Sequence, residues 1–191
     1  MILDTAKKAG VPIVLPILAV IAFAAMFCLA TFYPNIGKTG GPEKTVENFY
    51  LAYAGSDYEG MAENLSVFWS LQFLPQYGVN KPSELIEKRP EIVKDTAEIL
   101  SSTTTDIDTE LKVKVLPEYT QEWNNTAMVV YAGLKDEEEM GREVALLVKE
   151  KEDFYIYIWM PIYDEESIET LKSEFSEFDT YYSEILTNDE W

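Results

Sequence analysis

Residues 106–116 (DIDTELKVKVL) alternate between apolar and charged side chains, and this alternation decides the fold class. A period of two predicts a β-strand with one face toward a core. Three further strand-like runs follow, at residues 126–134, 144–149 and 154–162. Short charged segments join these three runs, which indicates antiparallel hairpins. We therefore expect a curved, four-stranded antiparallel sheet.

The residues before this sheet carry the periodicity of helices. The first helix begins near Pro42, and its apolar stripe consists of Val46, Phe49, Tyr50 and Tyr53. We expect Gly55 to close this helix in the left-handed conformation and Asp57 to cap a second helix. The apolar residues of the second helix are Tyr58, Met61, Ala62 and Leu65. The two form a helical hairpin in this interpretation.

Two further segments separate the hairpin from the sheet. The aromatic segment 67–77 is expected to begin as a helix and to finish extended. Another helix is expected over about 82–101, where Pro90 either kinks it or starts a new turn. Its predicted buried face consists of Ile92, Val93, Thr96, Ala97 and Leu100. Helices followed by an antiparallel sheet predict an α+β domain.

Residues 49–65 (FYLAYAGSDYEGMAENL), together with the later strand order, resemble the nuclear transport factor 2-like (cystatin-like cone) superfamily. The resemblance covers residues 42–163 and points to membrane-anchored or secreted prokaryotic domains of unknown function. It implies a conical pocket between sheet and helices. In the ketosteroid isomerase branch a tyrosine of the first helix polarises a carbonyl, and Tyr50 lies near that position. The base of that branch should follow the second helix, but residues 66–77 contain no Asp or Glu, so we predict no catalytic residue.

Aromatic side chains are the candidates for lining such a pocket. They are Tyr50, Tyr53, Trp69, Phe73, Tyr77, Tyr155, Tyr157 and Trp159. Strict alternation along the last strand places Tyr155, Tyr157 and Trp159 on one face. The alternative is that these side chains fill the core, which is the usual role of aromatic clusters.

Residues 164–191 predict an acidic amphipathic helix that is capped by Asp164. Its apolar stripe supplies the candidate interface residues Ile168, Leu171, Phe175, Phe178 and Tyr182. The stripe must be buried across the helix's own sheet, against a second copy of the chain, or in the groove of a protein partner.

The amino-terminal part predicts a membrane anchor. Residues 9–33 hold no charge over 25 positions, which is long enough to span a lipid bilayer with some tilt. Lys7 and Lys8 precede this run, so the positive-inside rule predicts that residues 1–8 are cytoplasmic and that the carboxyl-terminal domain is extracytoplasmic. Residues 34–41 are expected to be a short linker.

Other interpretations of the same segment are weaker. The run is too long for a cleaved secretory signal. A lipoprotein signal would place small residues before its cysteine, whereas Met26 and Phe27 precede Cys28. Residues 7–10 (KKAG) before an apolar helix resemble the processing site of archaeal type IV prepilins, which leaves a pilin-like subunit as an alternative.

Composition excludes several classes of function. The net charge of −19 disfavours nucleic acid as a partner, because nucleic-acid binding neutralises phosphates with Lys and Arg. There is no histidine and only one cysteine, so we expect no imidazole metal site, no disulfide and no cofactor. Two acidic clusters, 136–139 and 164–166, lack the spacing of a calcium loop. Asn64 and Asn124 lie in N-glycosylation triplets.

The sequence thus predicts a single-pass, membrane-anchored, extracytoplasmic module that binds a ligand or a protein partner without catalysis. It fits an accessory subunit of a membrane or surface complex, or a homo-oligomer. The alternatives are a cone-fold enzyme that acts on a small hydrophobic substrate and a pilin-like structural subunit.

Overall fold

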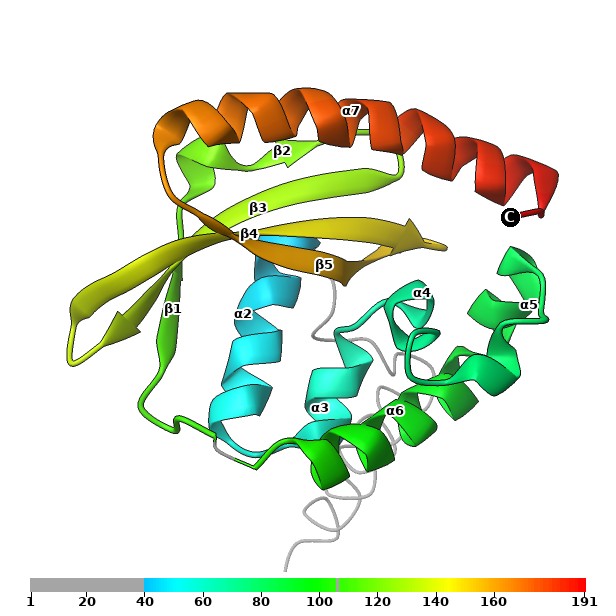
Figure 1. Ribbon diagram of the computed structural model, residues 1–191, viewed down its shortest axis with the longest axis horizontal. Helices are drawn as coiled ribbons and strands as arrows, with labels where there is room; N and C mark the ends of the chain where they lie inside the picture. The colour runs from blue at the N-terminus through cyan, green and yellow to red at the C-terminus, as the bar shows by residue number, and fades with distance from the viewer. Residues whose placement is uncertain (1–39, 106) are drawn as a thin grey trace, which may run out of the picture. The chain divides into compact units, whose positions relative to one another are not determined.

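A computed structural model of the protein describes residues 40–105 and 107–191, which form an α+β domain (Figure 1). Its helices are α2 (Gly41–Ala54), α3 (Tyr58–Glu63), α4 (Val67–Ser70), α5 (Pro82–Glu87), α6 (Arg89–Thr103) and α7 (Glu165–Asn188), with 3₁₀ turns η1 (Pro75–Tyr77) and η2 (Pro117–Tyr119). Its strands are β1 (Lys112–Val115), β2 (Gln121–Glu122), β3 (Thr126–Lys135), β4 (Glu138–Glu150) and β5 (Asp153–Ile162). The predicted α+β class is confirmed.

The predicted membrane span, residues 9–33, lies outside the described residues, as do the predicted cytoplasmic segment 1–8, most of the linker 34–41 and the prepilin-like site. Within residues 40–105 and 107–191, no helix combines the length and the apolar character that a bilayer crossing requires.

The predicted helical hairpin is α2 and α3, with one correction at the turn. Asp57 caps α3 as expected, because its Oδ1 accepts a hydrogen bond from the Gly60 amide at 3.0 Å. Gly55, however, has an ordinary right-handed backbone with φ of −82°. The left-handed residue is Ser56, with φ of +56°. The turn therefore reverses one residue later than we predicted.

The segment between the hairpin and the sheet also differs in part. Residues 67–77 begin with α4 as predicted but end in η1, so the extended finish was wrong. The predicted long helix is two helices, α5 and α6. Pro90 stands in the first turn of α6, where its missing amide hydrogen leaves no helical hydrogen bond unmade. Pro90 therefore starts a new helix rather than kinking one.

The sheet has the order β1-β3-β4-β5, all antiparallel (Figure 1). Strand β2 pairs with Ala127 and Met128 of β3, whereas β1 pairs with residues 131–134 of the same strand. The first predicted strand, residues 106–116, is reduced to the four residues of β1. The turn η2 and the two-residue strand β2 follow and were not predicted. Strand β2 has only two residues, both polar and exposed, so it contains no alternation of apolar and polar side chains. This is why the sequence pattern did not reveal it.

The two hairpins of the sheet are tighter than the charge pattern suggested. Residues 135–141 were predicted as a connection, but only Asp136 and Glu137 turn the chain, both with positive φ (51° and 68°). Strand β4 accordingly begins at Glu138 instead of residue 144.

The β4–β5 register shifts between Leu146 and Leu147, which leaves Tyr157 as an extra residue in β5. This β-bulge interrupts the alternation of the strand.

Helices cover both faces of the sheet (Figure 1). On one face, α2 and α3 pack on β3, β4 and β5, and the buried residues there include Val46, Phe49, Met61, Val129 and Leu147. On the other face α7 packs on Met128, Val130, Val144 and Leu146. Strand β3 is therefore buried on both faces from Thr126 to Ala132.

Helix α7 follows the first of the three arrangements that we considered for it. Its residues Ile168, Phe175 and Tyr182 are 1%, 6% and 3% exposed and pack in the domain's own core. Leu171 and Phe178 are half-buried beside them. The five predicted interface residues thus cover the sheet, and they are not free to hold a partner in this arrangement.

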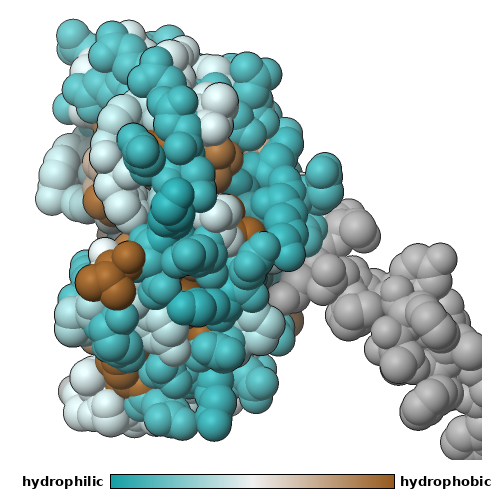
Figure 2. Space-filling view, turned by 90° about the vertical axis from the view of Figure 1, so that its right-hand side faces the viewer, coloured by the Kyte–Doolittle hydropathy of each residue, from teal (hydrophilic) through white to brown (hydrophobic). Residues whose placement is uncertain are grey.

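A third group of buried residues joins α4, α5 and α6 to α7 and the end of β4. It includes Val67, Phe68, Leu85, Ile92 and Tyr182. The surface over α5 and the carboxyl end of α7 is mainly hydrophilic, with apolar residues in separate small patches (Figure 2). This face is a solvated surface of the kind that a net charge of −19 favours.

Candidate functional site

A hollow of about 440 Å³ opens on the α2 side of the sheet, near the β3–β4 hairpin. This volume falls in the range of small-molecule sites. Its apolar walls are Leu111, Val113, Met140, Pro161, Ile162 and Tyr163. Met140 and Tyr163 are 69% and 88% exposed, so they form the rim of an open site.

Three polar side chains meet at the hollow: Tyr50 of α2, Tyr131 of β3 and Glu143 of β4. The Glu143 Oε2 atom accepts hydrogen bonds from the Tyr131 hydroxyl at 2.7 Å and from the Tyr50 hydroxyl at 3.0 Å. The two hydroxyl oxygens are 2.9 Å apart. Tyr131 and Glu143 are register partners on adjacent strands, so the sheet itself places them side by side.

Both hydroxyls are protonated at neutral pH, as in a free tyrosine. Burial is the main cause that raises the pKa of Tyr50 and of Tyr131 further, and the negative charge of Glu143 adds to this increase. A protonated phenol donates its hydrogen, so two donors are directed at one oxygen of the Glu143 carboxylate. The second oxygen, Oε1, has no hydrogen-bond partner among the described residues.

Two glycines make room for the hollow. Gly133 and Gly141 are cross-strand partners at its wall, one row beyond Tyr131 and Glu143. A Cβ atom on Gly141 would have no atom within 4 Å, and neither glycine has a positive φ. At Gly133 a Cβ atom would already contact Leu111 at 3.7 Å, whereas the space at Gly141 is open. A larger residue at Gly141 would therefore enter the hollow without backbone strain.

The predicted pocket aromatics do not gather around one cavity. Of the eight candidates, only Tyr50 lines the hollow. Tyr53 packs edge-on against Tyr50 with ring centroids 6.4 Å apart. The Tyr77 hydroxyl donates to Asp95 at 2.8 Å, and this bond raises the pKa of Tyr77 to about 12. Tyr155 lies under the guanidinium of Arg89.

A separate aromatic group lies on the α2 side of the sheet. Trp69 stacks on Trp159 with centroids 5.8 Å apart, and Phe73 contacts Trp69 at 5.1 Å. The Trp159 ring also packs against Phe49. Trp69 and Trp159 pack against the core, which fits the alternative interpretation of aromatic residues as packing groups, whereas Phe73 is 50% exposed.

Tyr157 was wrongly placed on the same face as Trp159. It stacks on Phe178 of α7 with centroids 5.5 Å apart, whereas Trp159 packs on the α2 side. The cause is the bulge at Tyr157, because one extra residue moves the side chains beyond it to the opposite face. The bulge has no marker in the sequence that we could identify.

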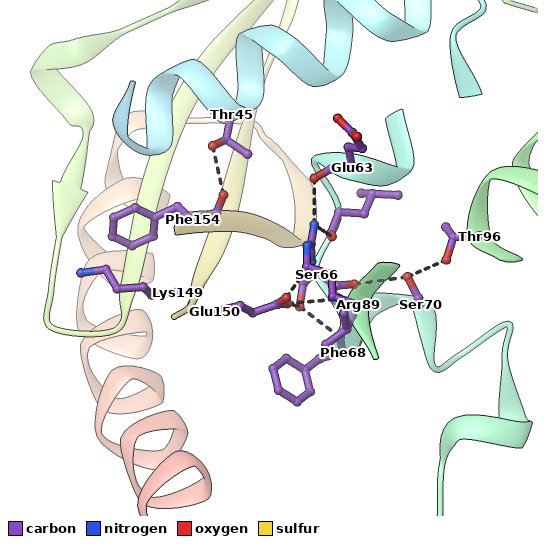
Figure 3. A network of polar contacts seen from close by, with 12 residues as sticks. Thr45, Glu63, Ser66, Phe68, Ser70, Arg89, Thr96, Lys149, Glu150 and Phe154 are labelled. Carbon is purple, nitrogen blue, oxygen red and sulfur yellow. Dashed lines mark hydrogen bonds and ion pairs between the residues drawn. The ribbon is translucent and has the colours of Figure 1, made fainter. Parts of the chain in front are cut away.

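The second polar arrangement is a buried ion pair, which sequence analysis did not predict (Figure 3). Arg89 Nη1 lies 2.6 Å from Glu150 Oε2, and the two side chains are 14% and 1% exposed. Glu150 Oε1 accepts from the Ser66 hydroxyl at 2.7 Å and from the Val67 amide at 2.8 Å. Burial raises the pKa of the Glu150 carboxyl, while the charge of Arg89 opposes this increase.

This ion pair connects elements rather than facing a cavity. Arg89 Nη2 also donates to the carbonyl oxygens of Glu63 and Leu65, at 2.8 and 3.0 Å, and its Cζ lies 3.3 Å from the ring centroid of Tyr155. These contacts are thus all directed at other parts of the fold. The network ties α3, α4 and α6 to the end of β4 and has a structural role.

The remaining sequence candidates have simple positions. Ser66 of the first glycosylation triplet is fully buried, and its hydroxyl is used by Glu150. Asn124 of the second triplet is exposed, whereas its Thr126 is buried and donates to Asp179 at 2.9 Å. Among the described residues there is no group of three or more His, Cys, Asp or Glu side chains placed to hold a metal ion.

Tyr131 and Glu143 are the site residues that sequence analysis missed. Both belong to strands that were recognised or partly recognised, and each is a polar group next to buried apolar residues. That pattern could have marked them, but only the register shows that they meet.

A scan of protein-family models, a search of curated proteins and a search of solved structures each gave no match to the chain.

Proposed function

We propose that the protein is a membrane-anchored, extracytoplasmic, non-catalytic binding module whose ligand occupies the hollow at Tyr50, Tyr131 and Glu143. The anchor is the apolar segment 9–33, with residues 1–8 in the cytoplasm. A protein partner in a membrane or surface complex remains compatible with this role. The observation that carries the proposal is a site-sized hollow whose walls are apolar and whose polar groups converge on one carboxylate.

Membership of the nuclear transport factor 2-like superfamily is part of the proposal. The order of elements supports it: a helical pair, then α4, α5 and α6, and then an antiparallel sheet. A short parallel bridge between Leu65 and Ile156 also connects the end of the helical pair to the last strand.

A second candidate function, an enzyme acting on a small hydrophobic substrate, is favoured by one observation. Tyr50 and Tyr131 keep their protons and lie within 3.0 Å of the Glu143 carboxylate. A phenol can donate to a substrate carbonyl while a carboxylate accepts a proton, so this pair of groups could support acid–base chemistry. The pilin-like alternative depends on residues outside the described ones.

The test is to purify the full-length protein from native membranes in mild detergent and to identify the small molecules that co-purify by mass spectrometry. The Gly141→Leu variant is the control, because its side chain should fill the hollow. We expect a compound that is enriched with the wild type, is depleted with the variant, and remains chemically unchanged on incubation.

Two outcomes contradict the proposal in different ways. Equal recovery from the wild type and from Gly141→Leu would show that the hollow is not the binding site. Conversion of the compound by the wild type, lost in Glu143→Gln, would instead support the enzyme.

A further inference from the structure

The Glu143 carboxylate has no positive partner among the described residues. No Lys or Arg forms an ion pair with it there. Among the described residues that line the hollow, Arg142 alone carries a positive charge. Its Nε donates to Glu139 at 2.9 Å, and its Nη1 lies 4.0 Å from Glu165. Adjacent strand residues point to opposite faces, so Arg142 is also turned away from Glu143.

Glu143 is half-buried beside the buried Tyr131, so its charge is partly removed from water. A carboxylate in this position is costly unless it is paired and hydrogen-bonded. The two tyrosines satisfy Oε2 alone. Oε1 therefore remains as an acceptor next to apolar walls, and the missing component is a positive charge.

We propose that the hollow binds a small molecule with a protonated amine on an apolar body, with its ammonium group at Glu143. The apolar body packs on Leu111, Val113 and Pro161, and the rim residues Met140 and Tyr163 lie over it. A tyrosine ring face and a methionine thioether suit an apolar or aromatic amine. The net charge of −19 favours a cation over an anion at long range. This inference rests on the proposed function, because it names the ligand class of the same site.

The test compares two matched probes, 4-fluorobenzylamine and 4-fluorobenzyl alcohol, by ligand-observed fluorine NMR on the full-length protein in nonionic detergent. The probes have similar shapes and differ in charge. We expect the amine to bind about tenfold more tightly, because a charge-assisted hydrogen bond is roughly twice as strong as a neutral one. The contribution of probe molecules that partition into micelles is removed by subtracting the signal measured with the Gly141→Leu variant in the same detergent.

Variants separate the local charge from the total charge. Glu143→Gln keeps the size of the side chain and should reduce the affinity for the amine to that for the alcohol. Glu177→Gln makes the same change in net charge on the exposed face of α7 and should leave the preference intact. If Glu143→Gln does not fold, added salt tests the wild type instead, because screening should weaken binding of the amine more than that of the alcohol.

Equal affinities of the two probes for the wild type would overturn the inference, and so would an amine preference that survives in Glu143→Gln. In either case, binding of both probes that Gly141→Leu abolishes would leave the hollow as a ligand site. Failure of both probes to bind at any accessible concentration also rejects the amine class. The mass-spectrometric identification of co-purifying small molecules then tests the hollow independently.

Discussion

At the scale of single residues, two carboxylates of β4 have opposite surroundings. Glu150 is almost fully buried and has three hydrogen-bonding or ionic contacts, from Arg89, Ser66 and Val67. Arg89 is itself anchored to backbone oxygens. Glu143 is only half-buried and lacks a cation among the described residues. The first carboxylate is therefore suited to holding elements together, and the second to contacting a ligand.

The Glu150→Gln substitution tests the structural role of the ion pair. Glutamine keeps an acceptor for Ser66 but leaves the charge of Arg89 without its partner in a largely buried site. We expect the free energy of unfolding to fall by about 3 kcal/mol. Urea unfolding of the full-length protein in nonionic detergent, followed by tryptophan fluorescence, measures this change.

The matched control is Glu47→Gln, which removes the acid of an exposed i,i+3 pair with Lys44. Exposed pairs contribute little, so its effect should stay within about 0.5 kcal/mol. Equal effects of the two substitutions would mean that the Arg89–Glu150 pair is no more important than a surface pair.

At the scale of elements, the most consequential feature is the position of α7. This helix covers the face of the sheet opposite α2 and α3, and Asp179 anchors it by accepting hydrogen bonds from the Asn125 amide at 2.8 Å and the Thr126 hydroxyl at 2.9 Å. The apolar stripe of α7 is thus buried against other parts of the same chain. A protein partner would have to bind elsewhere or displace the helix.

The Phe175→Ala substitution tests whether α7 is part of the core. Phe175 is 6% exposed between the helix and the sheet, so its truncation should leave a cavity and lower the free energy of unfolding by about 3 kcal/mol. The control is Tyr181→Ala on the same helix, where the side chain is 54% exposed. Its effect should stay below about 1 kcal/mol. The same urea titration distinguishes them, and a neutral Phe175→Ala would show that α7 does not stay on the sheet.

At the scale of the whole molecule, the described residues contain a core that is closed on both faces of the sheet. Its three buried groups draw all their members from residues between Val46 and Ile185. The surface around them is strongly acidic, which keeps like molecules apart. The domain therefore has the features of an independent folding unit.

Expression of residues 40–191 without the preceding segment tests this conclusion. We expect a soluble protein that unfolds in one cooperative urea transition, because its apolar faces are already covered. A second fragment, 40–163, lacks α7 and should aggregate, because it exposes Met128, Val130, Val144 and Leu146. Size-exclusion chromatography compares the two. Aggregation of 40–191 would indicate that another chain normally covers part of its surface.

The candidate site could be predicted only in part. Tyr50 was recognised because it lies on the apolar stripe of a clear helix, near the tyrosine of a resembling family. Tyr131 and Glu143 were missed because their role depends on contacts with Tyr50, which is far from both in the sequence. Tyr131 lies 81 positions after Tyr50, and Glu143 lies 93 positions after it. The aromatic residues were overestimated as pocket residues, since aromatic composition does not distinguish a filled core from a cavity.

By itself, the sequence determined the helices, the main strands, the α+β class and the acidic surface, because the spacing of apolar residues directly reports which side of an element is buried. Only the tertiary structure decided the bulge at Tyr157, the partner of Arg89, the covering role of α7 and the meeting of Tyr131 with Glu143. These features depend on strand register and on packing between distant segments, and neither of these leaves a periodic signal in the local sequence.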